Sequence, residues 1–92
     1  MNSAAHSIAP ADRWGPFAEG IDPAERLARL RSLRAIAHLC LGPRGDAFVG
    51  ALHQSERDPD HMPAALRALD ALAPLDRRQV LASFARLHRP PA

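Results

Sequence analysis

The residues best suited to bind a metal ion gather between positions 53 and 61. His53, Asp58, Asp60 and His61 offer the imidazole and carboxylate ligands that suit zinc or a similar ion. However, no two histidines have the i, i+4 spacing of a two-histidine site on a helix, and no pair of cysteines accompanies them. We therefore predict a solvated loop here, and neither a metal site nor a cofactor.

Cys40 is the single cysteine and the first candidate nucleophile. A reactive thiolate needs a nearby base and an accessible, electropositive site. His38 is two positions away, which on a helix places it on a different side. Cys40 shares a helical face with Leu33 and Ile36, so we predict a buried structural cysteine that reacts slowly with thiol reagents. One cysteine permits no intramolecular disulfide, which favours a reducing compartment.

Other signs of catalysis are missing from the sequence. Acidic residues stand where helices are expected to begin, as at Asp22, Asp60 and Asp76, rather than in pairs suited to acid–base chemistry. No nucleophile elbow, phosphate-binding loop or dinucleotide fingerprint occurs. We expect no enzymatic activity. With no signal peptide and no apolar run of the roughly 18 residues that a bilayer requires, we expect a cytoplasmic protein that does not bind membranes.

Arginine supplies all twelve basic residues, which indicates a GC-rich and, we expect, bacterial genome. Four arginines crowd one predicted helix: Arg26, Arg29, Arg31 and Arg34. Arginine binds phosphate well, so a nucleic-acid-associated regulator is the alternative function. The ten acidic residues leave a formal net charge of only +2, whereas nucleic-acid binders usually carry a larger, clustered excess. We therefore favour a solvated charged face over a nucleic-acid site.

The elements that position these residues are all expected to be helical. Asp22 and Pro23 are typical of a helix start, and Gly42 followed by Pro43 is typical of a helix end. Similar signals, with Asp60 and Asp76 as N-caps, predict the later helices. The expected helices span residues 23–41, 44–55, 61–72 and 76–88. Short connections predict antiparallel neighbours, with a helical hairpin formed by the last two helices.

The chain is thus predicted to be a small, single-domain, all-α bundle of about four short helices. The helical domain spans residues 21–89, after an irregular leader (1–20) and before a short tail (90–92). Within the first helix, the core face is expected to contain Leu30, Leu33, Ile36, Ala37, Cys40 and Leu41. Ala28, Ala35 and Leu39 form a second apolar stripe, which predicts contacts on two sides of this helix. In the second helix, Gly50 could let another helix approach closely.

The leader contains the single tryptophan, Trp14, and one of the three phenylalanines, Phe17. Gly15, Pro16 and Gly20 exclude a regular helix or strand there. Two alternatives remain open. The leader folds back and adds both rings to a core that is short of large side chains, or it stays mobile and the rings anchor a partner. We favour the fold-back alternative.

The function expected from these patterns is a helical protein–protein interaction module, an accessory subunit or regulator of a larger protein. Its partner is a larger protein or a second copy of the chain, and nucleic acid is the less favoured alternative. The expected partner-binding residues are Trp14, Phe17, Arg31, Arg34 and His38. We expect replacement of Arg31 and Arg34 by glutamate to abolish partner binding with little change in stability.

Overall fold

A computed structural model of the chain describes residues 15–87. These residues form helices α2 (Pro23–Leu41), α3 (Asp46–Arg57), α4 (Met62–Ala71) and α5 (Pro74–Leu87), with the 3-10 segments η2 (Gly42–Gly45) and η3 (Pro59–His61) between them. No strand occurs within this part of the chain, so the predicted all-α class is confirmed. In the same residues, no helix is both long and apolar enough to cross a membrane.

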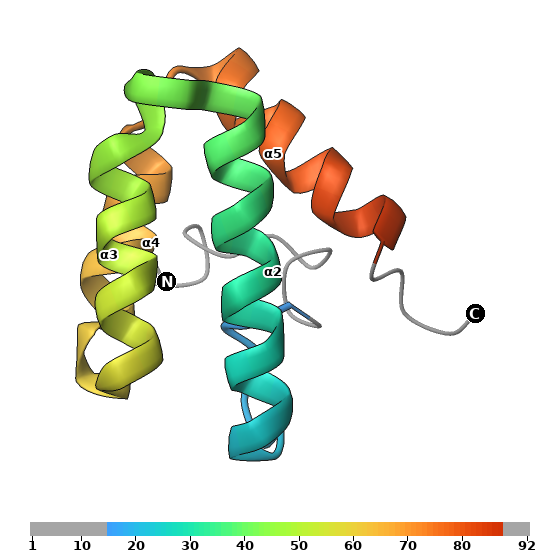
Figure 1. Cartoon of the computed structure of the whole chain (residues 1–92), viewed down its shortest axis with the longest axis vertical. Coiled ribbons are helices and arrows are strands. Elements are labelled where there is room, and N and C mark those ends of the chain that lie inside the picture. Colours follow the sequence, from blue (N-terminus) through green and yellow to red (C-terminus); the bar gives the residue numbers. More distant parts are fainter. Residues whose placement is uncertain (1–14, 88–92) are drawn as a thin grey trace, which may run out of the picture.

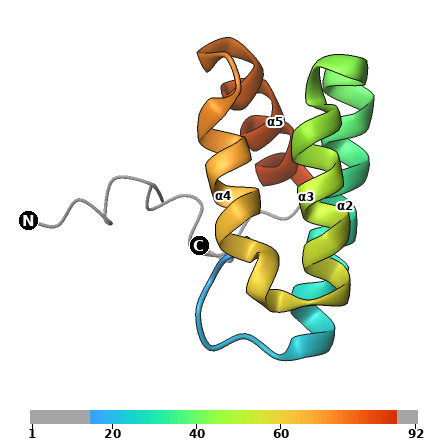
Figure 2. The same ribbon diagram turned by 90° about the vertical axis from the view of Figure 1, so that its left-hand side faces the viewer.

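Helix α2 lies at the centre of the arrangement. It packs against α3 on one side and α5 on the other, while α4 packs against α3 (Figures 1 and 2). The predicted hairpin between the last two helices is wrong, because α5 packs chiefly on α2. Leu72, with φ −65° and ψ 152°, ends α4 in an extended conformation. The chain changes direction there, and α5 leans away from α4 (Figure 1).

The two ends of α2 agree with the signals in the sequence. The side chain of Asp22 accepts hydrogen bonds from the backbone N–H groups of Ala24 (2.9 Å) and Glu25 (3.4 Å). Gly42 ends the helix with φ 57°, a left-handed conformation that favours glycine. Local chemistry therefore determines both boundaries of α2.

The N-caps expected for the two later helices are wrong. Asp58, not Asp60, carries the capping side chain, and it accepts from the N–H of Asp60 at 3.0 Å where η3 begins. Helix α5 begins at Pro74, so Asp76 lies within its first turn. There the Asp76 carboxylate pairs with Arg44 instead of capping the helix.

The core combines side chains from all four helices with Phe17 of the leader. Its largest fully buried side chains are Phe48, Leu30, Leu33, Leu52, Leu69 and Val80. Cys40 is half-buried, not fully buried as expected, and packs at the margin of this core. Its Sγ lies 3.8 Å from the Ser83 Oγ, so the thiol occupies the seam between α2 and α5.

Gly45, rather than Gly50, allows a close approach. A Cβ atom at Gly45 would lie 2.8 Å from the Leu41 Cβ, closer than carbon atoms pack. Gly50 is exposed and faces open space, so the expectation that it admits another helix is wrong. Gly45 lets the chain turn tightly from η2 into α3 over the end of α2.

Candidate protein-interaction surface

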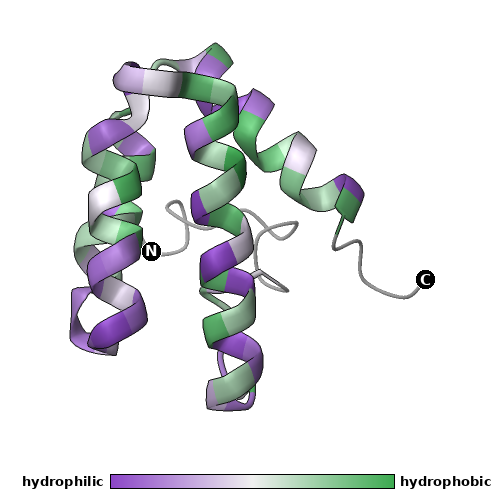
Figure 3. Cartoon of the chain, viewed as in Figure 1, coloured by the Kyte–Doolittle hydropathy of each residue, from purple (hydrophilic) through white to green (hydrophobic). Residues whose placement is uncertain are grey.

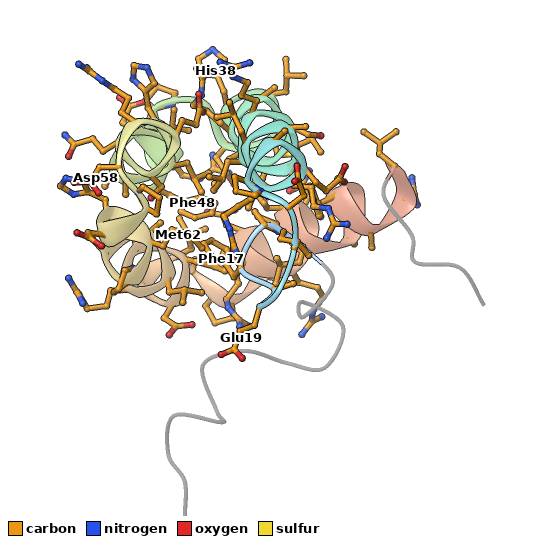
Figure 4. The ribbon with its side chains drawn as sticks, turned by 90° about the horizontal axis from the view of Figure 1, so that it is seen from below. Phe17, Glu19, His38, Phe48, Asp58 and Met62 are labelled. Carbon is orange, nitrogen blue, oxygen red and sulfur yellow. The ribbon has the colours of Figure 1, made fainter. Side chains whose placement is uncertain are left out.

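The described part of the leader folds back onto the helices. The N–H of Ala18 donates to the Gly15 carbonyl oxygen at 3.1 Å and closes a turn. Phe17 and Ala18 are each only 8% exposed, and Phe17 points into the interior in Figure 4. Phe17 is therefore a core side chain and is not presented to a partner. Trp14, the other expected anchor, lies outside the described residues.

Two arginines of α2 hold this segment in place. Arg26 Nη1 donates to the Pro16 carbonyl oxygen at 2.8 Å, and Arg29 Nη1 donates to the Gly15 carbonyl oxygen at 3.3 Å. Arg29 Nε also pairs with Glu25 at 2.8 Å. Figure 2 shows the segment running down to the N-terminal end of α2, where the helix begins. The leader thus contributes apolar burial and occupies guanidinium donors of both arginines.

Arg34 and Arg31 share one acidic partner on α3. Arg34 pairs with Glu56 through Nε, and its Nη2 lies 3.3 Å from the Glu56 Oε1. Arg31 Nε lies 3.6 Å from the same carboxylate. The Glu56 side chain is only 7% exposed, whereas those of Arg34 and Arg31 are 36% and 63% exposed. Arg34 therefore joins two helices in addition to facing solvent.

Glu56 is the partner that the sequence patterns did not reveal. It stands two positions before Asp58, in a stretch whose acids and arginines resemble an ordinary solvated run. Its partners follow from the antiparallel packing of α2 on α3, which places the end of α3 beside the middle of α2. The sequence signal that leads to this pair is the short connection between the two predicted helices, which makes them antiparallel neighbours.

Helix α2 is contacted on two sides as expected, by α3 and α5, but its second apolar stripe is covered by neither and is exposed. Ala28, Ala35 and Leu39 lie on it, and Leu39, at 82%, is the most exposed large apolar side chain within residues 15–87. Arg31 and His38 are exposed beside the stripe, and His38 points away from the bundle in Figure 4. We call these five residues the outer face of α2.

Helix α2 changes in character along its length. Hydrophobic residues predominate towards its C-terminal end, whereas charged residues interrupt its N-terminal half (Figure 3). The inward residues of the C-terminal half, such as Ile36 and Leu41, belong to the core. Ala35 and Leu39 are apolar residues of this half that stay in contact with water. Exposed apolar side chains that lie together on one face form the kind of surface that partners cover.

The candidate metal ligands do not converge. Among residues 15–87, no three histidine, cysteine or acidic side chains are placed to hold a metal ion. His53, Asp58, Asp60 and His61 are all exposed, and the His61 Nε2 lies 3.8 Å from the Asp58 Oδ2. This pair lies on the polar connection between α3 and α4.

Comparison with known proteins gives no match: no protein-family model, no curated protein and no solved structure matches this chain.

Proposed function

We propose that the protein is a small helical interaction module, an accessory subunit or regulator that binds a larger protein through the outer face of α2. The observation that carries the proposal is the 82% exposure of Leu39 in line with two exposed alanines. Covering an exposed leucine contributes roughly 1.5–3 kcal/mol, a substantial part of the free energy of a modest interface.

The contacts of the arginines favour a protein partner over nucleic acid. Arg26 and Arg29 donate to backbone carbonyls of the leader, and Arg31 and Arg34 share the carboxylate of Glu56. Arginines that bind phosphate present their donors outward, as sequence-independent binding requires. Here these four side chains form hydrogen bonds or ion pairs within the chain itself.

Site-specific photo-crosslinking in cells that produce the protein tests the proposal. A photoreactive amino acid at Ala35, on the outer face of α2, is expected to give a defined crosslinked species with another protein. The matched control is the same substitution at Ala82, an exposed alanine on α5. The Leu39→Ser substitution is expected to reduce the Ala35 crosslink.

Equal crosslinking from Ala35 and Ala82, or none from Ala35, would contradict docking through this face. A crosslink to RNA or DNA from Ala35 would instead favour the nucleic-acid alternative. Its signature in a binding assay is a steep fall of affinity with salt, which apolar docking does not show.

A further inference from the structure

We propose that the outer face of α2 binds an amphipathic helix of the partner that carries acidic residues along one edge. This inference rests on the proposed docking function and names the chemistry of what docks. Three properties of the face support it: its length and shape, the unequal charge of its two edges, and the poor match that a second copy would make.

The shape of the face suits a helix. Ala28, Ala35 and Leu39 follow one line along α2, and the eleven steps from Ala28 to Leu39, at 1.5 Å each, give it a length of about 16 Å. Alanine side chains let the backbone of a second helix approach to about 8 Å between axes. Leu39 then provides the one large side chain that can enter the groove of an approaching helix.

The edge of the face towards α3 is basic. Arg31 and His38 lie along it, with Arg34 behind them, and Glu56 is the acid that faces the two arginines. One carboxylate therefore balances two guanidinium groups. His53, one helical turn before Glu56 on α3, is also exposed. A carboxylate on the partner would meet a net positive charge here.

The opposite edge lacks such an excess. Glu25 pairs with Arg29 at 2.8 Å, so the charges there are balanced within one turn of α2. A partner helix lying along the face thus meets positive charge on one side and near neutrality on the other. Acidic residues on the edge of the partner helix that faces α3 complement this unequal charge and fix the orientation of the partner helix.

A second copy of the chain fits this face poorly. In a twofold antiparallel pair of α2 helices, each edge meets the same edge of the other copy, so Arg31 and His38 would face their counterparts. In a parallel pair, the basic edge would meet the Glu25–Arg29 pair, which carries no excess negative charge. Neither arrangement supplies the acid that the basic edge lacks, so the occupant is a different, acidic helix.

A display library of amphipathic helical peptides tests the inference. Positions along both polar edges of each peptide are randomised among Glu, Gln and Lys, and binders are selected on the full chain. At the positions of one edge, Glu is expected to occur about five times as often as Lys in the selected peptides. This is the bias that an exposed ion pair produces. Selection on the Arg31→Gln variant is expected to lose this bias.

Matched variants restrict the result to this face. The Leu39→Ser substitution is expected to weaken the selected peptides about tenfold, while Leu75→Ser leaves them unchanged, because Leu75 is an equally apolar, 73% exposed residue on α5. Arg86→Gln, on the exposed side of α5, controls for general charge. Both control positions keep the outer face of α2 intact.

Lysine-rich binders, binders without edge bias, or no binders would overturn the acidic-helix inference. Such a result leaves the docking function standing if Ala35 still crosslinks to a protein in cells. Concentration-dependent dimerisation in analytical ultracentrifugation that Leu39→Ser abolishes would also overturn it, because a second copy would then cover the face.

Discussion

The guanidinium of Arg34 and the carboxylate of Glu56 join α2 to α3 through two nitrogen–oxygen contacts. The carboxylate is almost entirely shielded from water, at 7% exposed, and Arg31 approaches it from farther away. A charge that is shielded in this way is stable only while its partner is present. The two arginines, equivalent in the sequence, therefore have unequal roles in stability.

We predict that Arg34→Gln lowers the free energy of unfolding by about 1–3 kcal/mol, because it leaves the buried carboxylate with Arg31 alone. Arg31→Gln is expected to change it by no more than about 0.5 kcal/mol. Urea unfolding monitored by circular dichroism measures both. This replaces the expectation from the sequence that both arginines can be reversed without loss of stability.

A double-mutant cycle with Glu56→Gln separates the pair from its surroundings. The loss caused by Arg34→Gln is expected to shrink when Glu56 is already neutral, since no unpaired charge is then left in place. Equal losses from Arg34→Gln in both backgrounds would show that Arg34 stabilises the fold by packing alone.

The parts of this fold that follow from neighbouring residues could be predicted from the sequence. Helix α2 is the clearest case, because the Asp22 cap and the Gly42 stop act within one turn of each boundary. The same local preference predicts N-caps at Asp60 and Asp76, and both of these predictions are wrong. At Asp76 the reason is tertiary, since a pairing with Arg44, 32 positions away, uses its carboxylate.

The candidate surface depends still more on long-range packing. The exposed side of α2 is as apolar in pattern as a second core stripe, and periodicity cannot tell whether a neighbour covers it. The direction that α5 takes after Leu72 decides which side of α2 is covered. The same holds for Phe17, for which the sequence left two alternatives and the structure shows a place in the core.

The two glycines of the α3 region give a second prediction. Gly45→Ala is expected to destabilise the protein by about 1–3 kcal/mol, because the new Cβ would lie 2.8 Å from the Leu41 Cβ and force the two segments apart. Gly50→Ala is expected to stabilise it by about 0.4–1 kcal/mol, since the site is open and helical. Thermal unfolding of both variants, compared with the natural chain, measures the contrast. Changes of the same sign in both variants would contradict this account of Gly45.

Burial of Phe17 gives a third prediction. Phe17→Ala is expected to lower the free energy of unfolding by about 3 kcal/mol, and removal of residues 1–19 by at least as much, because both delete the leader's ring from the core. Arg26→Gln is expected to cost less, about 1 kcal/mol, through the lost bond to the Pro16 carbonyl.

Denaturant unfolding with a matched control measures the effect of the leader. Leu87→Ala also truncates an apolar side chain, but one that is 70% exposed, and it is expected to change stability by no more than about 0.5 kcal/mol. If Phe17→Ala matches Leu87→Ala, the leader does not contribute to the core in solution. That outcome would favour the alternative in which the Phe17 ring anchors a partner.

The fourth prediction concerns the ion pair that ties η2 to α5. Arg44 Nε lies 3.1 Å from the Asp76 Oδ2, and Arg44 Nη2 lies 3.0 Å from the Oδ1. The hydrogen bonds from Arg44 lower the pKa of the Asp76 carboxyl below its ordinary value, and the positive charge of Arg44 acts in the same direction. A pKa that is lower in the folded state stabilises the fold above the unfolded pKa, and this stabilisation disappears as the pH falls through the folded value.

We therefore predict that Arg44→Gln raises the pKa of Asp76 towards its ordinary value. The stability difference between the natural chain and this variant is expected to be present near pH 6 and to vanish in strong acid, once Asp76 is protonated in both. Titration of the Asp76 carboxyl carbon by NMR measures the pKa, and urea unfolding at each pH measures the stability. Arg67→Gln, an exposed substitution on α4, is the control and should leave the Asp76 titration unchanged. An unchanged pKa for Asp76 in Arg44→Gln would show that the two side chains do not pair in solution.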